Sequence, residues 1–481
     1  MTMRELLSSQ IGVDETPVRG RPYGMRKAVL LSLLLGCGAR STPATDALEK
    51  RLPLTSQVVV LDNGLRVVVQ EDHRTPVVAV AVVYHAGSAA DPPGKKGLAH
   101  LVEHMMFEGS KHVRRGELDG TLGEVGAAHK NAFTDVDVTL YHETIPSARL
   151  ETALFLESDR MGFALDAHTP EVLESVRSVV VEELHQRYDH APGGRAYSVL
   201  RKALYPKDHP YHDLPIGTAA DLASIQLADV RDFWLRNYGP DNATLVLVGD
   251  VRADQAVDLA RKWFGPLPKG PPRPKLTPWI PALDKDVMFT LEADVELPEL
   301  LVGWLTVPLT DPAFVDVAAM THQMGWSVSG RLVKDKHLVR NVGAQPVSDL
   351  RAGSSVIHLK LEPGSTPEKV LEEMDVALAD MSKYLHWTHG DDDVKEALYD
   401  DYTKAVYDLD GLEQRARTFG LCDLQFGDPR CTPRLLRDLE RVTKDKVVET
   451  FRLAILNGHR VVVHTKPTPG APMGGRLVGG S

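Results

Sequence analysis

A proline-rich stretch near the middle of the chain constrains its fold more than any other feature. The first eleven residues of the stretch 265–283 include five prolines. Proline fixes φ and lacks a backbone N–H, so neither a helix nor a central strand continues through such a segment. We interpret 265–283 as a linker between two parts, residues 53–264 and 284–466. A chain of 481 residues has room for about two to four domains.

The two parts follow a similar order of patterns. Each begins with β-rich runs, continues into helical spacing and closes with a helix followed by a strand. The closing pair is 230–238 with 244–248 in the first part, and 446–456 with 460–464 in the second. This repetition favours an internal duplication.

Turn and tail signals lie at the two ends of this repeated region. Asn63 and Gly64 separate two β-rich runs, 58–61 and 65–70, which predicts a β-hairpin. Residues 467–481 are rich in Gly and Pro and lack a core-forming pattern, so we expect a flexible tail.

The N-terminal residues 1–52 contain an export pattern. A basic pair at 26–27 precedes the mostly apolar run 28–35, and Cys37 ends a Leu-Leu-Gly-Cys sequence that resembles a bacterial lipobox. We expect translation to begin at Met25, and the product to be exported to the periplasm or cell envelope with a lipid anchor on Cys37. The alternative is a short buried helix.

Charge, hydropathy and cysteine content indicate which kinds of partner, membrane attachment and covalent cross-link the chain can have. The 55 basic and 66 acidic residues give a net charge of −11, which argues against a nucleic-acid binder. No apolar run reaches the roughly 20 residues of a transmembrane helix, so a lipid would be the only membrane attachment. Cys422 and Cys431 are expected either to form a disulfide in an exported chain or to be two small buried hydrophobic residues.

An H-x-x-E-H motif is formed by His100, Glu103 and His104. On a helix the two histidines lie one turn apart on one face, and two neutral imidazoles at that spacing can bind one zinc ion. Glu103 shares this face and can act on a water molecule without binding the metal, as in inverted zinc-protease helices. A surface helix with two solvated histidines is the alternative.

A zinc site needs a third protein ligand from elsewhere in the chain. Glu182 and Glu183 follow an apolar run within the helical pattern 169–188. Adjacent helical side chains point about 100° apart, so only one of these carboxylates is expected to face the metal. A solvated acidic pair on a helix surface is the alternative.

Longer stretches of the chain resemble the pitrilysin-type (M16) metallopeptidases, which include mitochondrial processing peptidase, pitrilysin and insulin-degrading enzyme. The likeness is closest to the short bacterial members and extends from about residue 58 to 464. The stretches that carry it are 61–67, 97–109, 131–141, 181–184, 209–211, 216–217, 233–238 and 242–250.

The resemblance implies a fold and a set of zinc ligands. The fold would be α+β, with two duplicated α/β halves, each a mainly antiparallel sheet packed with helices, forming a clam-like cavity. Zn²⁺ would be bound by His100, His104 and Glu183, with Glu182 as the alternative third ligand, and Glu103 would be the general base.

A substrate-binding strand is implied as well. Asn131, Ala132 and Phe133 match the strand to which extended substrates add in the family. The residues alone, without the resemblance, predict an ordinary edge strand.

Two departures from the family pattern affect the expected function. The position seven residues before Glu183, where the family often has a glutamate, is Val176. In the second half, the Arg and Tyr that bind the substrate carbonyl align with Lys334 and Arg340, so the tyrosine is missing.

The resemblance therefore implies a zinc-dependent endopeptidase subunit that hydrolyses peptides or unfolded protein segments. A homologous partner chain would supply the Arg/Tyr pair. The alternative is a non-catalytic scaffold subunit of an envelope complex.

Overall fold

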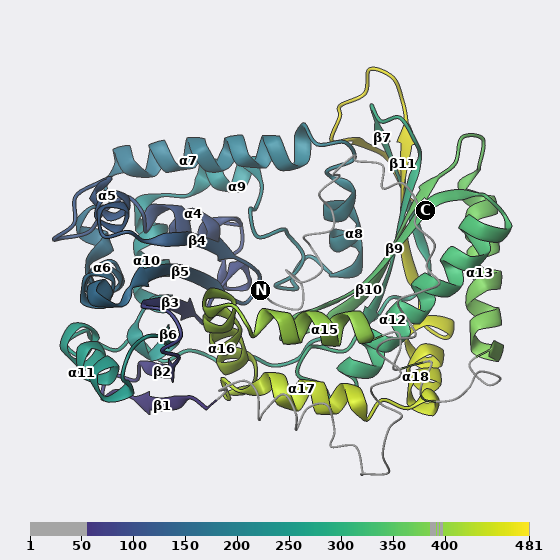
Figure 1. Cartoon of the computed structure of the whole chain (residues 1–481). Helices are drawn as coiled ribbons and strands as arrows, with labels where there is room; N and C mark the ends of the chain where they lie inside the picture. The colour runs from purple at the N-terminus through teal and green to yellow at the C-terminus, as the bar shows by residue number, and fades with distance from the viewer. Residues whose placement is uncertain (1–54, 385–390, 392–393, 395–397, 481) are drawn as a thin grey trace, which may run out of the picture.

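A computed structural model describes residues 55–480 except 385–390, 392–393 and 395–397. The expected signal and spacer, with the lipid-bearing Cys37, lie outside the described residues. Two sheets stand at opposite ends of the molecule, with helices around and between them (Figure 1). Within the described part of the chain, no helix combines the length and apolar character needed to cross a bilayer.

The first sheet has the strand order β1-β2-β6-β3-β5-β4. β2 runs parallel to β6, and every other neighbouring pair is antiparallel. The predicted hairpin at Asn63 and Gly64 joins β1 to β2, and Gly64 has a φ of 92°, a conformation that glycine adopts without a Cβ clash. The strands are β1 (Gln57–Val60), β2 (Arg66–Glu71), β3 (Val77–Tyr84), β4 (Ala128–Thr134), β5 (Thr139–Pro146) and β6 (Ala243–Gly249).

The second sheet repeats this arrangement strand for strand. Its order is β12-β7-β11-β8-β10-β9, with β7 parallel to β11 and all other pairs antiparallel. Only the outermost strand differs, because β1 begins the first half whereas β12 ends the second. The repeated topology confirms the predicted duplication. The strands are β7 (Val287–Ala293), β8 (Glu299–Thr306), β9 (Val339–Ser348), β10 (Gly353–Leu361), β11 (Arg460–Pro467) and β12 (Arg476–Gly480).

Helices follow the strands of each half. Those before residue 265 are α4 (Leu98–Met105), α5 (Glu117–Glu124), α6 (Leu150–Phe163), α7 (Pro170–Leu184), α8 (Ala196–Leu204), α9 (Ala219–Ser224), α10 (Leu227–Asn237) and α11 (Ala253–Phe264). Those after residue 286 are α12 (Phe314–Ser329), α13 (Pro367–Tyr384), α15 (Tyr399–Asp408), α16 (Leu412–Phe426), α17 (Cys431–Glu440) and α18 (Lys444–Phe451). Between α11 and β7, residues 265–286 form neither helix nor strand.

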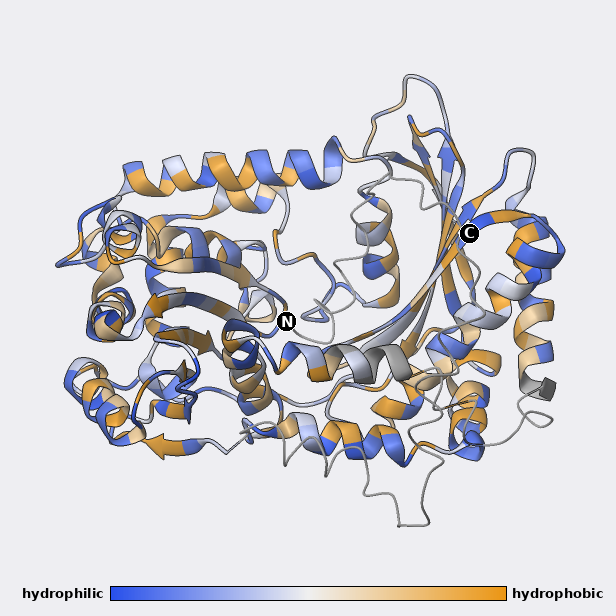
Figure 2. Cartoon of the chain, in the orientation of Figure 1, coloured by the Kyte–Doolittle hydropathy of each residue, from blue (hydrophilic) through white to orange (hydrophobic). Residues whose placement is uncertain are grey.

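The first sheet is covered on both faces, which explains the continuous apolar sequence of β3. Val78, Val80 and Val82 belong to the core that contains α4, whereas Ala79 and Ala81 face the core that contains α16. In Figure 2, β3 is largely apolar, whereas β4 at the edge of the sheet carries hydrophilic residues.

Each half contributes a helix to the sheet of the other half. α8 packs against β8 and β11, and α16 packs against β3 and β6. Leu200 and Leu204 of α8 share a core with Val461 of β11, and the fully buried Arg415 of α16 donates to the Asp72 carboxylate at 3.0 Å. The linker therefore separates two parts whose cores are joined.

The C-terminal segment differs from the expected flexible tail. β12 pairs antiparallel with β7, and its side chains are exposed. Pairing at a sheet edge requires backbone donors and acceptors rather than an apolar side-chain pattern, so composition alone did not predict this strand. Before β12, the Gly474 N–H donates to the Asp189 carbonyl at 2.8 Å, and the Gly474 carbonyl accepts from the Arg195 N–H at 3.0 Å.

Cys422 and Cys431 form a disulfide, with their Cα atoms 5.4 Å apart. Of the two expected alternatives, pairing is therefore the one observed. The disulfide joins α16, which crosses to the first sheet, to the start of α17.

Candidate active site

The H-x-x-E-H motif lies on α4, and buried residues fix both ends of this helix. The Asp91 carboxylate accepts hydrogen bonds from the backbone N–H of Gly97 (2.9 Å) and Ala99 (2.8 Å). At the other end, His168 Nε2 donates to the Met105 carbonyl at 3.0 Å. Both contacts satisfy backbone groups that a helix leaves unpaired at its ends, so they hold α4 in place.

The two histidines of the motif lie close together, with ring centroids 4.8 Å apart. Burial lowers the pKa of His100 to about 4, so this imidazole is neutral at physiological pH. Burial also opposes protonation of His104, but the hydrogen bond to Glu183 and the charge of Glu103 outweigh it and raise the pKa of His104. The candidate ligand atoms of His100, Glu103 and His104 all lie within 4.8 Å of one another.

Glu183 comes from α7, which packs beside α4. Its Oε2 lies 3.3 Å from His104 Nε2 and 3.7 Å from His100 Nε2. The Glu182 carboxylate instead accepts a hydrogen bond from the Gln186 side chain at 3.0 Å. Of the two predicted third ligands, Glu183 is thus the one next to the histidines.

α7 begins and packs as its sequence predicts. Thr169 caps it by accepting from the Val172 N–H, and Pro170 occupies the first helical position. Val176, at the position where the M16 family often has a glutamate, is buried in the core of the first half. This side chain therefore packs in the core and provides no second carboxylate near Glu183.

Glu103 is buried beside β4. Its Oε2 accepts a hydrogen bond from Thr134 Oγ1 at 2.5 Å. Burial raises the pKa of Glu103 to about 7, while the Thr134 hydrogen bond and the charge of His104 act in the opposite direction. A carboxylate with such a pKa can both accept and release a proton near neutral pH.

β4 is the outermost strand of the first sheet, and no described strand pairs with its outer edge. It carries Asn131, Ala132 and Phe133, of which Asn131 is exposed and the other two are half-buried. Thr134, which contacts Glu103, is the last residue of the same strand. The free edge of β4 therefore runs directly to the buried carboxylate.

The aligned Arg/Tyr positions lie in the second half. Lys334 belongs to a π-helical turn after α12, η6 (Gly330–Asp335), and Arg340 lies on the exposed side of β9. The Arg340 guanidinium is 3.5 Å from Glu362. Neither position provides a phenol hydroxyl.

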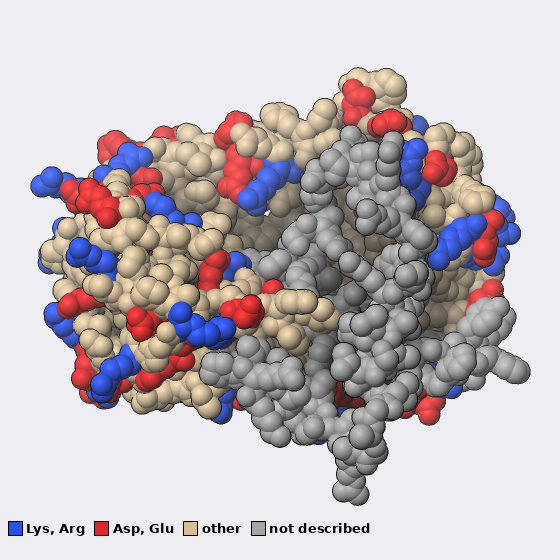
Figure 3. All heavy atoms as spheres, viewed as in Figure 1, with Lys and Arg blue, Asp and Glu red and all other residues tan. Residues whose placement is uncertain are grey.

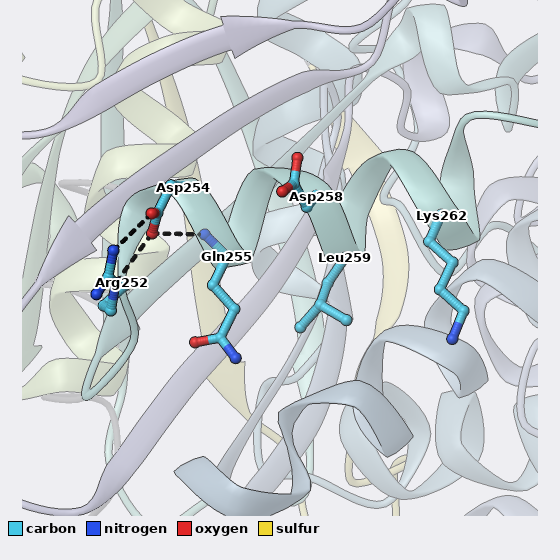
Figure 4. Close-up of a pocket in the computed structure, with 6 residues that line it drawn as sticks. All are labelled: Arg252, Asp254, Gln255, Asp258, Leu259 and Lys262. Atoms are coloured by element: carbon cyan, nitrogen blue, oxygen red, sulfur yellow. Dashed lines mark hydrogen bonds and ion pairs between the residues drawn. The ribbon is translucent and has the colours of Figure 1, made fainter.

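On the face seen in Figure 3, acidic and basic side chains are interspersed, and the surface is hollowed between the two halves. A separate shallow pocket runs along exposed residues of α11, where Arg252 pairs with Asp254 (Figure 4). α11 carries none of the candidate site residues.

Two family models match the chain. Residues 66–187 match the insulinase model of peptidase family M16, and residues 224–386 match the model of the peptidase M16 inactive domain. Together these matches cover more than half of the chain. The chain belongs to peptidase family M16.

Individual M16 relatives agree with this assignment. The chain is 34% identical over 286 residues to the zinc protease PqqE of Helicobacter pylori, covering 59% of this chain and 62% of the relative. It is 27% identical over 212 residues to the beta subunit of the mitochondrial-processing peptidase of Saccharomyces cerevisiae, covering 44% of each. The matches thus span less than two thirds of these relatives' own lengths.

A solved protease structure matches over most of the chain. The crystal structure of a protease from Helicobacter pylori superposes with a TM-score of 0.77 at 25% identity, covering 86% of this chain and all of that one. This similarity agrees with the two-half architecture described above.

The sequence did not predict the residues that form hydrogen bonds to the H-x-x-E-H motif and its helix. Asp91, Thr134 and His168 each contact α4 or Glu103 from outside the helix. Their distance from the motif in sequence follows no helical or strand period, so no local pattern indicated them. Arg187, four residues after Glu183, had such a signal in its i,i+4 spacing.

Proposed function

We propose that this chain is a zinc-dependent endopeptidase subunit that hydrolyses peptides or unfolded protein segments. The observation that carries the proposal is the convergence of His100, His104 and Glu183, with Glu103 buried beside them. Relatives named zinc proteases support the class of reaction.

The donor set fits zinc. Imidazole nitrogen and carboxylate oxygen are common zinc ligands, and bonds of about 2.0–2.1 Å place neighbouring ligands of a tetrahedral site about 3.3 Å apart. The Glu183 Oε2 distances of 3.3 and 3.7 Å to the two imidazole nitrogens are close to this spacing. His100, His104 and Glu183 would hold the ion, which leaves Glu103 free for proton transfer.

Zinc, when bound, would lower the pKa of a coordinated water and polarise a substrate carbonyl. Glu103 would take a proton from the attacking water and later deliver it to the leaving amine nitrogen. Thr134 would keep the carboxylate of Glu103 oriented during both transfers.

Substrate would add to the free edge of β4 as an extended strand. Backbone groups of Asn131, Ala132 and Phe133 would supply hydrogen bonds without regard to sequence, which suits unfolded segments. Because β4 ends at Thr134, a peptide on this edge would approach Glu103.

A homologous M16 partner would complete the site. Lys334 and Arg340 lack a hydroxyl that could donate to the developing negative charge on the carbonyl oxygen, and one missing donor typically costs about 10²–10³ in rate. The name of the yeast relative, a beta subunit, is in keeping with a two-chain enzyme.

The export pattern and the disulfide support a location in the periplasm or cell envelope, with a lipid anchor on Cys37. Disulfides persist in oxidising compartments. The bond between Cys422 and Cys431 agrees with such a compartment.

The test compares metal content and peptide cleavage in three proteins. Wild-type chain should bind one zinc ion and cleave a peptide library when mixed with a homologue bearing the Arg/Tyr pair. Glu103→Gln should keep the zinc but lose cleavage, because an amide cannot accept the proton. His104→Ala should lose both.

Two outcomes would contradict parts of the proposal. A wild-type chain without zinc or cleavage would favour the non-catalytic scaffold. Full activity of the isolated chain would remove the need for a partner.

A further inference from the structure

Arg187 contacts Glu183 on the carboxylate oxygen that the histidines do not share. Oε1 of Glu183 lies 3.0 Å from Nη2 of Arg187, whereas Oε2 faces the Nε2 atoms of His100 and His104. The two oxygens of one carboxylate thus have separate partners. Glu183 is mostly buried, with its side chain 19% exposed, while that of Arg187 is 65% exposed.

Arg187 lies just beyond a change of helix type. α7 ends at Leu184, and the next residues form the π-helical turn η4 (His185–Asp189), closed by a bond from the His190 N–H to the His185 carbonyl. Arg187 follows Glu183 by four residues across this junction. A glutamate N-terminal to a cation at that spacing is the favourable order for a helical ion pair.

The charge of Arg187 reaches the whole cluster. Burial has the largest effect on the pKa of His100, Glu103, His104 and Glu183, and the charge of Arg187 acts to lower all four. The pKa values of Glu103 and His104 nevertheless lie above their ordinary values. Arg187 contacts the cluster directly through the Glu183 carboxylate.

We propose that Arg187 is a positioning residue, which holds one oxygen of Glu183 so that the other faces the two imidazoles. This inference rests on the proposed zinc function. A glutamate side chain has several rotatable bonds, and fixing it before the metal arrives reduces the entropy lost on binding. Partners of metal ligands typically contribute 10- to 100-fold to metal affinity.

The competing explanation is an ordinary surface ion pair, and the sign of the effect on zinc affinity separates the two. An exposed pair contributes little to stability. Removing a positive charge near a cation site would, by Coulomb's law alone, tighten metal binding. Positioning predicts the opposite, weaker binding when the guanidinium is removed.

The experiment measures the zinc dissociation constant by competition with a chromophoric chelator. Arg187→Met should weaken zinc binding by about ten-fold or more, and Arg187→Lys by less. Arg195→Met is the matched control, because Arg195 is 51% exposed and pairs with Asp189, which is not one of the candidate zinc ligands. It should bind zinc like the wild type, and all three variants should show the wild-type circular dichroism spectrum.

A second background tests whether Arg187 acts through Glu183. In Glu183→Ala, which should bind zinc weakly, the added Arg187→Met change should not weaken zinc binding any further. Unchanged or tighter zinc binding by Arg187→Met, or an equal loss in both backgrounds, would overturn the inference while leaving the zinc site intact. A wild-type chain that binds no zinc would instead overturn the proposed function, and this inference with it.

Discussion

Glu103 and Glu183 are both carboxylates, yet their surroundings suit them to different proposed roles. Glu103 is buried, so its proton affinity is high even though Thr134 donates a hydrogen bond to its carboxylate. Glu183 lies between two imidazoles and a guanidinium, which together hold its pKa below the ordinary value despite burial. An easily protonated carboxylate suits a base, and a permanently charged one suits a ligand.

Thr134 gives a residue-scale prediction. Thr134→Val removes the hydroxyl that donates to Glu103 while keeping the shape of the side chain. A hydrogen bond to a charged group is worth about 1.5–3 kcal/mol, so kcat should fall by roughly 10- to 100-fold, with KM and zinc content unchanged. Thr134→Ser, which keeps the hydroxyl, is the control and should retain most of the activity. Equal kcat values for Thr134→Val and wild type would show that the Thr134 hydroxyl does not orient Glu103 for catalysis.

At the scale of single residues, the sequence predicted the H-x-x-E-H motif but not the residues that contact it. His100, Glu103 and His104 could be predicted as a site because helical spacing places them on one face. The choice between Glu182 and Glu183 needed the direction of α7, since neighbours in sequence differ only by rotation about the helix. Thr134 could not be singled out, because its contact depends on how β4 packs against α4.

At the scale of elements, the C-terminal segment supports the helix that carries Glu183. Gly474 exchanges backbone hydrogen bonds with Asp189 and Arg195, on either side of the loop that follows η4. A Cβ atom on Gly474 would lie 2.0 Å from the Tyr188 carbonyl oxygen. Only glycine therefore fits without displacing this backbone.

Gly474→Ala should lower both stability and zinc affinity. Overpacking of this kind costs about 1–3 kcal/mol, and the displaced loop adjoins Glu183 through η4. The measurements are urea unfolding and chelator competition. Gly479→Ala is the control, because a Cβ there meets nothing within 4 Å. Equal behaviour of the two variants would mean that the segment does not support the site.

Helices, strands and turns could be predicted where one local pattern of apolar, polar or turn-forming residues dominates the sequence. The hairpin at Asn63, the helix with the motif and the buried strand β6 all follow such patterns. β12 did not, because an exposed edge strand depends on the partner β7. The sequence also did not predict that α8 and α16 each pack on the sheet of the other half. An apolar helix face does not specify which sheet it will cover.

At the scale of the whole molecule, the exchanged helices make the two halves one folding unit. Arg415 lies on α16 but is buried against Asp72 of the first half, and both side chains are almost fully inaccessible. The Arg415 guanidinium also donates to Gln70 at 3.1 Å. Similar bonds join Arg66 to Asp423 across the same boundary.

Arg415→Met should therefore destabilise the whole chain. Without Arg415, the buried Gln70 and Asp72 side chains lose a hydrogen-bond donor, and Asp72 keeps only the exposed Arg74 as its ion-pair partner. Lost hydrogen bonds to a charged group should lower the free energy of unfolding by about 1.5–3 kcal/mol. Chemical unfolding monitored by circular dichroism gives the value. Arg252→Met, which removes an exposed pair on α11, should change stability by less than about 1 kcal/mol. Similar losses in both variants would argue against a coupling role for Arg415.

The same pair predicts a dependence on pH. Arg74 lowers the pKa of Asp72 below its ordinary value, burial opposes this, and Arg415 lowers it further. A carboxyl with a depressed native pKa stabilises the fold above its unfolded pKa of about 4, and this contribution is lost as pH falls. In both proteins the stability that the Asp72 charge contributes should therefore fall as the pH drops below about 4. Because Arg415 lowers the Asp72 pKa beyond the effect of Arg74, the wild type should lose this contribution at a lower pH than Arg415→Met. Loss at the same pH in both proteins would contradict this explanation.

The central claim is that two imidazoles of α4 and one carboxylate of α7 hold a single zinc ion. Diffraction from crystals of the zinc-loaded protein, measured above and below the zinc absorption edge, tests it most directly. We predict one anomalous peak within about 2.0–2.2 Å of Nε2 of His100, Nε2 of His104 and one oxygen of Glu183. A peak bound by other residues, or none at this position, would contradict the account.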